Sequence, residues 1–211
     1  MSESAHIAEA GLWDARIWQA VIAGAVVAFG WWVNGWQNRR AAAARRAERL
    51  RDVHRALFAE IGAHLANLGG AEALDLYADR MVSRMEADPA FIPFIPHEAN
   101  DRVFGAVVAD IHILPRSSID PVVAYYSQIA SVAALARDMR GVGFRGLEQP
   151  RRIAIYRDYI EMKKQAFAFG DYALTIIDAY AKGGRDGALR AEAAERARAG
   201  ISTPGADRSG R

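Results

Sequence analysis

Glu60 and His64 are the first side chains in this sequence whose types and spacing indicate chemistry. They stand four positions apart, so a helix would place both on one face, where a carboxylate and an imidazole can share a proton or a metal ion. A di-metal site in a helical bundle needs Glu-x-x-His pairs on two helices, and this pair has a different spacing and no second copy. We therefore expect no metal site, with His64 at the edge of a core and Glu60 in water.

Three aspartates also stand where acid–base chemistry would need them. Asp110 lies in an apolar run, and Asp171 and Asp178 are seven positions apart, on nearly one face of a helix. Paired carboxylates act as acid and base when burial or mutual repulsion raises one pKa. We favour a polar stripe that faces water or pairs with arginine. The start of the last predicted helix is basic and is likewise expected to face water rather than an anionic partner; its basic residues are Arg151, Arg152, Arg157, Lys163 and Lys164.

The sequence lacks the motifs of phosphate binding and of nucleophilic catalysis. The glycine-rich stretch GVGFRG follows no predicted strand and is not followed by Gly-Lys-Ser/Thr, so it is neither a dinucleotide loop nor a nucleotide loop. Neither Gly-x-Ser-x-Gly nor His-Glu-x-x-His occurs. The chain has no cysteine, which excludes disulfides, thiol nucleophiles and thiolate-bound metals. We predict no cofactor, and no specific enzymatic activity follows from the sequence.

The overall composition is that of a globular protein, with 52% hydrophobic and 25% charged residues. Its net charge is only +2, but six arginines fall between Arg39 and Arg51. The chain has 24 arginines and 3 lysines, a ratio that a GC-rich coding sequence produces without any nucleic-acid partner. We therefore predict no nucleic-acid binding, and the composition favours a bacterial source.

The arginine cluster follows a long uncharged segment, residues 17–38. As a helix, residues 17–36 would span roughly 30 Å, which is the thickness of the hydrocarbon core of a bilayer. Indole rings favour the two interfaces of a membrane, because an apolar ring and an N–H donor are both satisfied there. All five tryptophans flank the apolar run, at one end or the other: Trp13, Trp18, Trp31, Trp32 and Trp36. We predict a transmembrane helix over residues 17–37.

Two alternatives to a membrane span fit the segment less well. A buried helix of a soluble core rarely keeps an uncharged run of this length, and it has no reason to carry tryptophan at both ends. A cleaved signal peptide should begin with basic residues, but residues 1–16 contain Glu3, Glu9 and Asp14 against Arg16 alone.

The distribution of basic residues predicts the orientation of this helix. One arginine precedes it and six follow within fifteen residues, so its carboxyl side should be cytoplasmic. Residues 1–16 would then form a short extracytoplasmic segment of a single-pass protein in a bacterial inner membrane. The basic cluster that marks the cytoplasmic interface also suits anionic lipid headgroups, although a topology signal alone explains it. Its first members are Arg39, Arg40, Arg45 and Arg46.

One face of the predicted span carries small residues one turn apart: Ala20, Gly24 and Ala28. Such a small-xxx-small face permits two helices to approach closely and would support self-association. The same spacing is common in apolar segments rich in alanine and glycine, so an unpaired helix is the alternative.

Residues 38–182 are predicted to fold as a cytoplasmic bundle of four to five helices, which makes the fold class all-α. The transmembrane helix should continue through the alanine run 41–44 and end at Gly69-Gly70. Further helices are expected at about 72–87, 98–113, 120–140 and 150–181, with Ser118 or Asp120 capping the fourth. Residues 183–211 have few large apolar side chains and should form a flexible tail, with at most a short frayed helix. The inward face of the first helix should comprise Leu50, Val53, Leu57, Ile61, Leu65 and Leu68.

A loop in this bundle contains the apolar hexad FIPFIP, where prolines prevent a regular helix. Its large side chains either fold onto the core of the domain itself or form an exposed patch for a partner or the bilayer. The candidate docking residues are Phe91, Ile92, Phe94 and Ile95.

Three functions remain open from the sequence. The first is a membrane-anchored interaction or scaffold protein that docks to another protein or to itself, as a subunit of a membrane complex. The second is a signalling module in which the continuous helix transmits movement, although the short outer segment leaves little room for a ligand-binding domain. The third is an enzyme at the membrane surface that uses Asp110, Glu60 or the Asp171/Asp178 pair, and the lack of a catalytic arrangement disfavours it.

Overall fold

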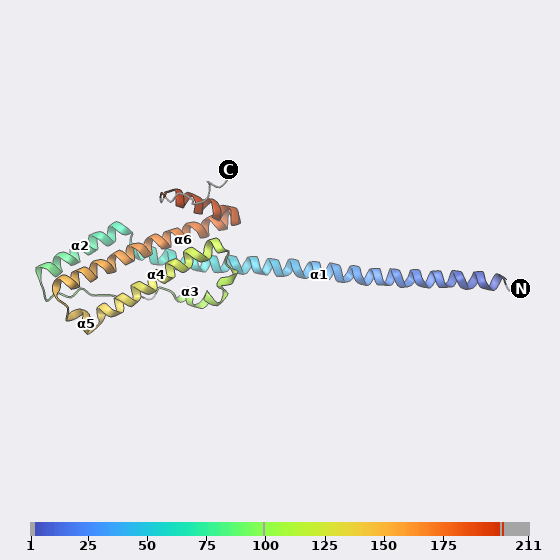
Figure 1. The fold of residues 1–211 in the computed structure, drawn as a ribbon, viewed down its shortest axis with the longest axis horizontal. Coiled ribbons are helices and arrows are strands. Elements are labelled where there is room, and N and C mark those ends of the chain that lie inside the picture. Colours follow the sequence, from blue (N-terminus) through green and yellow to red (C-terminus); the bar gives the residue numbers. More distant parts are fainter. Residues whose placement is uncertain (1–2, 99, 199, 201–211) are drawn as a thin grey trace, which may run out of the picture. The chain divides into compact units, whose positions relative to one another are not determined.

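The computed structural model of this protein describes residues 3–98, 100–198 and 200, while the side chains of residues 3–17 and 20 lie outside the description. Across these residues the fold is entirely helical, as predicted, and no strand occurs among them (Figure 1). The chain divides into two units, residues 1–49 and 50–211, which are described separately below. The helices are α1 (Glu3–Leu68), α2 (Ala71–Ala87), α3 (Arg102–Val107), the 3₁₀ helix η1 (Val108–Ile113), α4 (Arg116–Arg140), α5 (Val142–Arg145) and α6 (Gln149–Arg198).

The long first helix ends where the sequence predicts. α1 runs without a break through the alanine run 41–44, whose high helix propensity favours this continuity. It stops before Gly69 and Gly70, which have φ angles of 72° and 97°. Only glycine adopts such angles at little cost, so the pair terminates the helix.

The second unit is a bundle in which α6 packs against both α4 and α2 (Figure 1). One core cluster joins α2 and the first half of α6 to the second half of α4, around Met85, Met139 and Tyr156. The other joins the end of α1 to the first half of α4 and the middle of α6, around Ile61, Tyr125 and Ala173. The predicted inward face of α1 is confirmed: four of its members are buried and two are partly buried, as the apolar spacing requires.

Two of the predicted helices differ from those observed. Residues 98–113 form no single helix, because α3 begins only at Arg102 and η1 follows it. α4 begins at Arg116 behind an extended Pro115, whose carbonyl accepts the amides of Ser118 and Ile119. The predicted caps Ser118 and Asp120 are therefore inside the helix. Ser118 is buried there, and Pro121 lies inside the helix, where it has no N–H to donate to the carbonyl one turn before it.

The chain beyond residue 183 is helical as far as Arg198, so the predicted boundary of the flexible tail does not hold. Gly184 breaks α6 with φ 58° and ψ −148°, and the last part of the helix, red in Figure 1, folds back toward the part before it. Small residues rather than large ones make this contact, because Ala188 is fully buried and Gly187 lies against the backbone of Ala179. Composition alone therefore underestimated the packing of this segment. Residues 199 and 201–211 of the predicted tail lie outside the described residues.

Gly187→Ala is expected to displace this terminal helix, because a Cβ atom at residue 187 would overlap the carbonyl oxygen of Ala179. Overpacking of this kind costs about 1–3 kcal/mol. Hydrogen exchange measured by mass spectrometry should show faster exchange of the amides of residues 185–198. Gly143→Ala is the matched control, since no atom lies near its added Cβ. Unchanged protection in Gly187→Ala would contradict the packing described here.

Candidate functional site

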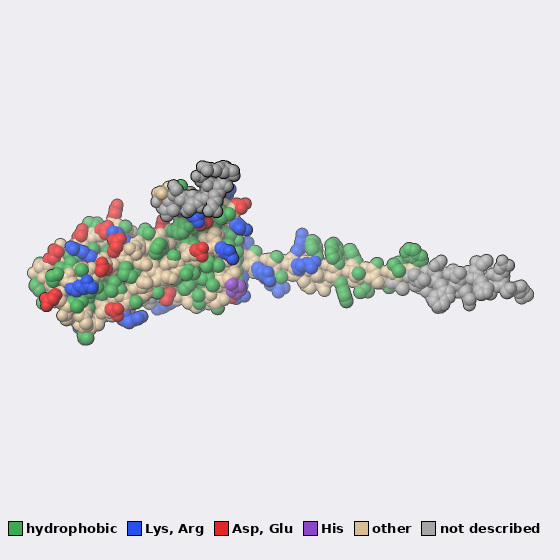
Figure 2. Space-filling view, viewed as in Figure 1, with side chains coloured by type: hydrophobic (Ala, Val, Ile, Leu, Met, Phe, Trp, Pro, Cys, Tyr) green, Lys and Arg blue, Asp and Glu red, His purple; other side chains and the backbone are tan. Residues whose placement is uncertain are grey.

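The first unit exposes a long row of large apolar side chains on α1. Their exposed fractions run from 43% at Trp36 to 78% at Trp31. Figure 2 shows these hydrophobic side chains standing out from the helix, with basic side chains following them along α1. Water-soluble surfaces rarely carry so continuous an apolar row without a partner or a membrane against it. Its members are Trp18, Val21, Ile22, Val26, Val27, Phe29, Trp31, Trp32 and Trp36.

The end of this apolar row joins the basic cluster through a direct contact. The guanidinium of Arg40 lies 3.8 Å from the ring centroid of Trp36, which is a cation–π arrangement. The other predicted interface residues on this side, Trp31, Trp32, Arg39, Arg45 and Arg46, are also exposed on α1. Of the predicted outer tryptophans, Trp18 is exposed, whereas the side chain of Trp13 lies outside the described residues.

The predicted helix-packing face is open over the part that is described. Gly24 and Ala28 are exposed, and a Cβ atom added at Gly24 would meet no atom within 4 Å. The third member, Ala20, has a side chain outside the described residues. Self-association through this face stays a prediction.

By length and composition, α4 is the one helix among the described side chains that is apolar enough to cross a membrane. Its position argues against that role, because Val122, Tyr125 and Ala136 are fully buried in the bundle. The helix also begins at Arg116 and ends at Arg140. α4 is therefore a core helix of the bundle. The uncharged run of α1 begins among residues whose side chains are not described.

The sequence predicted that Glu60 lies in water. Instead, its carboxylate caps the start of α3. Its carboxylate accepts the backbone N–H groups of Val103 at 2.6 Å and Phe104 at 3.0 Å. The hydroxyl of Tyr126 also donates to it, at 2.6 Å. Tyr126 stacks on Phe104 with ring centroids 3.9 Å apart, so one carboxylate and one ring pair hold α3 against α1 and α4. Glu60 thus has a structural role.

His64 is buried, as predicted, and pairs with a tyrosine instead of with Glu60. Its Nδ1 lies 2.5 Å from the hydroxyl of Tyr125, whose ring is fully buried. Burial lowers the pKa of His64, which favours the neutral ring. Among the described residues, no group of three or more His, Asp and Glu side chains is arranged to hold a metal ion.

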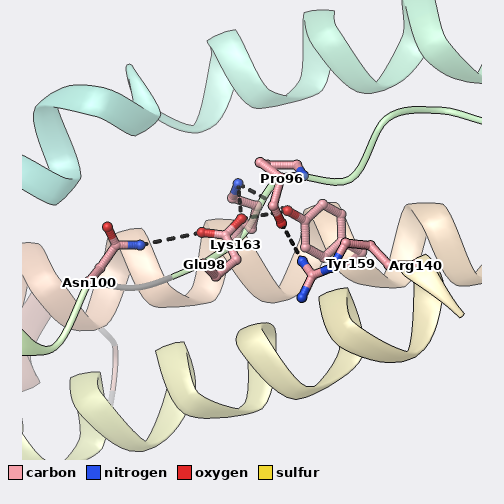
Figure 3. A network of polar contacts seen from close by, with 6 residues as sticks. All are labelled: Pro96, Glu98, Asn100, Arg140, Tyr159 and Lys163. Carbon is pink, nitrogen blue, oxygen red and sulfur yellow. Dashed lines mark hydrogen bonds and ion pairs between the residues drawn. The ribbon is translucent and has the colours of Figure 1, made fainter.

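Glu98 and Lys163 form a largely buried ion pair, which corrects the expectation that Lys163 faces water (Figure 3). The Lys163 ammonium lies 2.9 Å from the Glu98 carboxylate, which also accepts the Tyr159 hydroxyl at 2.6 Å and the Asn100 amide at 3.3 Å. Burial alone would raise the pKa of Glu98, but the hydrogen bonds from Tyr159 and Lys163 lower it overall. The pair fastens the segment after the apolar hexad to α6. Arg140 adds a hydrogen bond to the carbonyl of Pro96, at 2.6 Å.

A small cavity lies between His64, Glu98 and Lys163, with a volume of about 30 Å³. A water molecule needs roughly 10–15 Å³ measured in this way, and it also needs polar partners. The cavity meets both conditions. The acid–base groups around it are arranged to stabilise the fold.

His54 is a second buried histidine, and its environment predicts a pH-dependent stability. Its ring packs edge-on against Tyr180 and its Nε2 has no hydrogen-bond partner. Burial lowers the pKa of His54 from 6.5 to about 4. The unfolded chain therefore binds a proton at a higher pH than the folded chain, and stability should fall as the pH is lowered from 6.5 to 4.

His54→Leu should reduce this loss of stability, because the variant has no imidazole to protonate on unfolding. The measurement is the urea midpoint of the full-length protein at several pH values in this window. A smaller slope should remain, since the pKa of His64 is also lowered. His112→Leu, at an exposed position, is the control and should keep the full slope. An unchanged slope in His54→Leu would contradict the assignment.

The three candidate aspartates do not form a site. Asp178 pairs with Lys182 at 2.6 Å on the same helix. Asp171 is exposed, about two turns before Asp178 on the same helix. Asp110 lies in η1, on a different element. The preferred interpretation of a polar stripe fits the positions of Asp171 and Asp178 on α6.

The apolar hexad folds mostly onto the core of the domain. Ile95 is buried, and Phe91 and Ile92 pack against the cluster around Met85. Only Phe94, among the four predicted docking residues, points outward, with 84% of its side chain exposed. The four residues therefore do not form one exposed patch, because three of them pack against the core.

Arg152 is buried, which corrects the expectation that it faces water. Its guanidinium donates to the carbonyls of Arg145, Leu147 and Pro89, and so connects the chain around α5 to the start of the loop after α2. The hydrogen-bond acceptors of this guanidinium are backbone carbonyls and not a carboxylate. The sequence gives no signal for such contacts, since every residue has a carbonyl.

Known proteins do not identify this chain. Comparisons with protein-family models, with curated proteins and with solved structures found no match. Function must therefore be argued from the geometry above.

Proposed function

We propose that this protein is a single-pass membrane protein whose helical bundle binds another protein at the cytoplasmic face of a bacterial inner membrane. The observation that carries the proposal is the exposed apolar row on α1 between Trp18 and Trp36. A bilayer suits such a helix, because its backbone hydrogen bonds are formed within the helix and its apolar side chains contact lipid.

The residues that follow the row support the orientation in this proposal. Trp31, Trp32 and Trp36 would lie at the cytoplasmic interface, with Arg39 and Arg40 in the headgroup region. The cation–π contact between Arg40 and Trp36 pairs the two residue types that this interface favours.

The polar groups of the bundle support an interaction role over a catalytic one. Glu60, Glu98, His64 and Lys163 each have a hydrogen-bond partner that joins two elements of the fold. The hydrogen bonds of these groups hold elements of the fold together, and the cavity between them has room for little more than a water molecule. By contrast, Phe94 and Val142 leave large apolar side chains exposed, at 84% and 87%. Exposed apolar groups of this kind are available to a protein partner.

Extraction of membranes with alkaline carbonate tests the anchor. The full-length protein is expected to stay in the membrane pellet, and a variant that lacks residues 17–37 is expected in the supernatant. Release of the full-length protein would refute the proposal. A reporter fused after Arg211 that is active only outside the cytoplasm would instead reverse the orientation.

Photo-crosslinking in cells tests the interaction. A photoreactive residue at position 94 is expected to give one defined protein adduct, whereas the same residue at the exposed position 55 in α1 should give none. A bundle without any adduct from position 94 would remove the support that Phe94 gives to a docking role.

A second candidate function is favoured by the continuity of α1. The helix α1 contains both the apolar row and the buried residues Ile61 and Leu65. This is the arrangement that a signalling module needs. Insertion of two glycines into the alanine run 41–44 would discriminate, because it should abolish signalling and leave simple anchoring and docking intact.

A further inference from the structure

A groove in the bundle lies between the start of α4 and the residues of α6 on both sides of its break at Gly184. One part of it is a cavity of about 560 Å³ lined by Arg116, Tyr180 and Arg185, among others. An adjoining part, of about 240 Å³, reaches Phe169 and Tyr172. Ser117, Asp120 and Glu192 line both parts, so the two are continuous. A volume of this size is typical of sites for small molecules.

The charged side chains of the groove change sign along its length. Arg116 and Arg185 line the first part only, and neither makes a hydrogen bond or ion pair with any described residue. Asp120, one turn further along α4, and Glu192, two turns further along α6, stand at the junction of the two parts. Glu192 already pairs with Arg196, while Asp120 has no such partner among the described residues. The groove therefore offers a basic end followed by an acidic middle.

The far end of the groove is apolar and aromatic. Ala124 and Pro121 of α4 face Phe169 and Tyr172 of α6 across the smaller part. Burial raises the pKa of Tyr172, and the charges of Glu192 and Asp120 are among the further causes. The acidic middle and the aromatic end are thus close enough to interact. Ser117 lines both parts of the groove, and its Oγ is buried without a hydrogen-bond partner among the described residues.

We propose that this groove binds a phospholipid with an ethanolamine headgroup. Its phosphate would pair with Arg116 and Arg185, its ammonium with Asp120 and Glu192, and the start of an acyl chain would cover Phe169 and Tyr172. Charge-assisted hydrogen bonds from arginine suit a phosphate, and the two carboxylates suit an ammonium. The shared chemistry is that of an ammonium–phosphate zwitterion, and the apolar end selects a lipid over the free headgroup. This inference does not rest on the membrane anchor, because all the residues involved belong to the bundle.

Calorimetric titration of the full-length protein, held in amphipol without added lipid, tests the proposal. The probes are dihexanoyl phosphatidylethanolamine, dihexanoyl phosphatidic acid and free phosphoethanolamine. The first should bind most tightly. Phosphatidic acid should bind roughly tenfold more weakly because it lacks the ammonium, and phosphoethanolamine should be weaker by a similar factor because it lacks the chains.

Variants connect the binding to the groove. Arg116→Gln and Arg185→Gln should each weaken the phosphatidylethanolamine complex roughly tenfold or more, and Arg137→Gln, exposed at the other end of α4, should not. Asp120→Asn should weaken that complex and strengthen the phosphatidic acid complex. Circular dichroism confirms that each variant is folded. Three results would overturn the proposal: no binding, equal affinity for phosphatidic acid, or free phosphoethanolamine bound as tightly as the lipid.

Discussion

Replacing Val26 and Val27 with arginine should prevent the full-length chain from entering a bilayer. The two side chains are 66% and 56% exposed in the middle of the apolar row on α1. Each arginine at the centre of a transmembrane helix raises the free energy of insertion by about 2.5–3.5 kcal/mol. The two together raise it by more than insertion of the remaining apolar residues readily offsets. The protein would be synthesised without cells in the presence of liposomes and then floated through a density gradient. The original chain should float, and the double variant should stay at the bottom.

The control for this experiment is Val123→Arg on α4. Val123 is 40% exposed on the bundle, so the substitution places one arginine at an exposed valine outside the proposed span, where the double variant places two inside it. This variant should float as the original chain does. Flotation of the Val26/Val27 double variant would show that the apolar row has another purpose, such as contact with a second copy of the chain.

The second large effect is expected for Lys163→Met. This change removes the cation from the ion pair with Glu98, whose side chain is only 9% exposed. Removal of one member of a buried pair typically costs about 3–5 kcal/mol, because the other charge is left buried without compensation. Pulse proteolysis of the full-length protein in urea measures the loss. It is a suitable probe because all five tryptophans lie in residues 13–36 and fluorescence would not report on the bundle.

Two further variants separate the charge effect from a general loss of packing. The combination of Glu98→Gln with Lys163→Met should recover part of the lost stability, since it removes the uncompensated carboxylate. Lys182→Met breaks an exposed pair with Asp178, and its effect should stay below about 1 kcal/mol. A Lys163→Met variant as stable as Lys182→Met would show that the buried pair has no structural role.

The sequence predicts the helices of this fold better than it predicts the contacts between them. The three–four spacing from Val53 to Leu65 identifies the buried face of α1, because burial of one helical stripe leaves a periodic signal. The stop at Gly69 and Gly70 is equally local, since it depends on the φ angles of those residues alone. Helix α2 also lies where it was expected.

The candidate site was predicted less well, because its contacts join distant parts of the chain. Glu60 looks like a surface residue in its own helix, and only α3, more than forty positions later, makes it a cap. Glu98 and Lys163 are separated by 65 positions, so no local pattern relates them. One available signal was the tyrosines on apolar faces, because buried hydroxyls need partners and Tyr125, Tyr126 and Tyr159 each find one. The terminal helix was expected to be short and frayed at most, and its packing was not predicted because small residues make its contact.

The membrane span of α1 is tested most directly by tryptophan fluorescence in brominated lipid. Because every tryptophan of the chain lies in or next to the proposed span, the signal reports on that segment alone. Bromine atoms on the acyl chains quench only indoles that are within the bilayer. In liposomes of brominated phosphatidylcholine, the full-length protein should lose most of its emission compared with ordinary phosphatidylcholine. Equal emission in the two lipids would contradict the span and, with it, the proposed function.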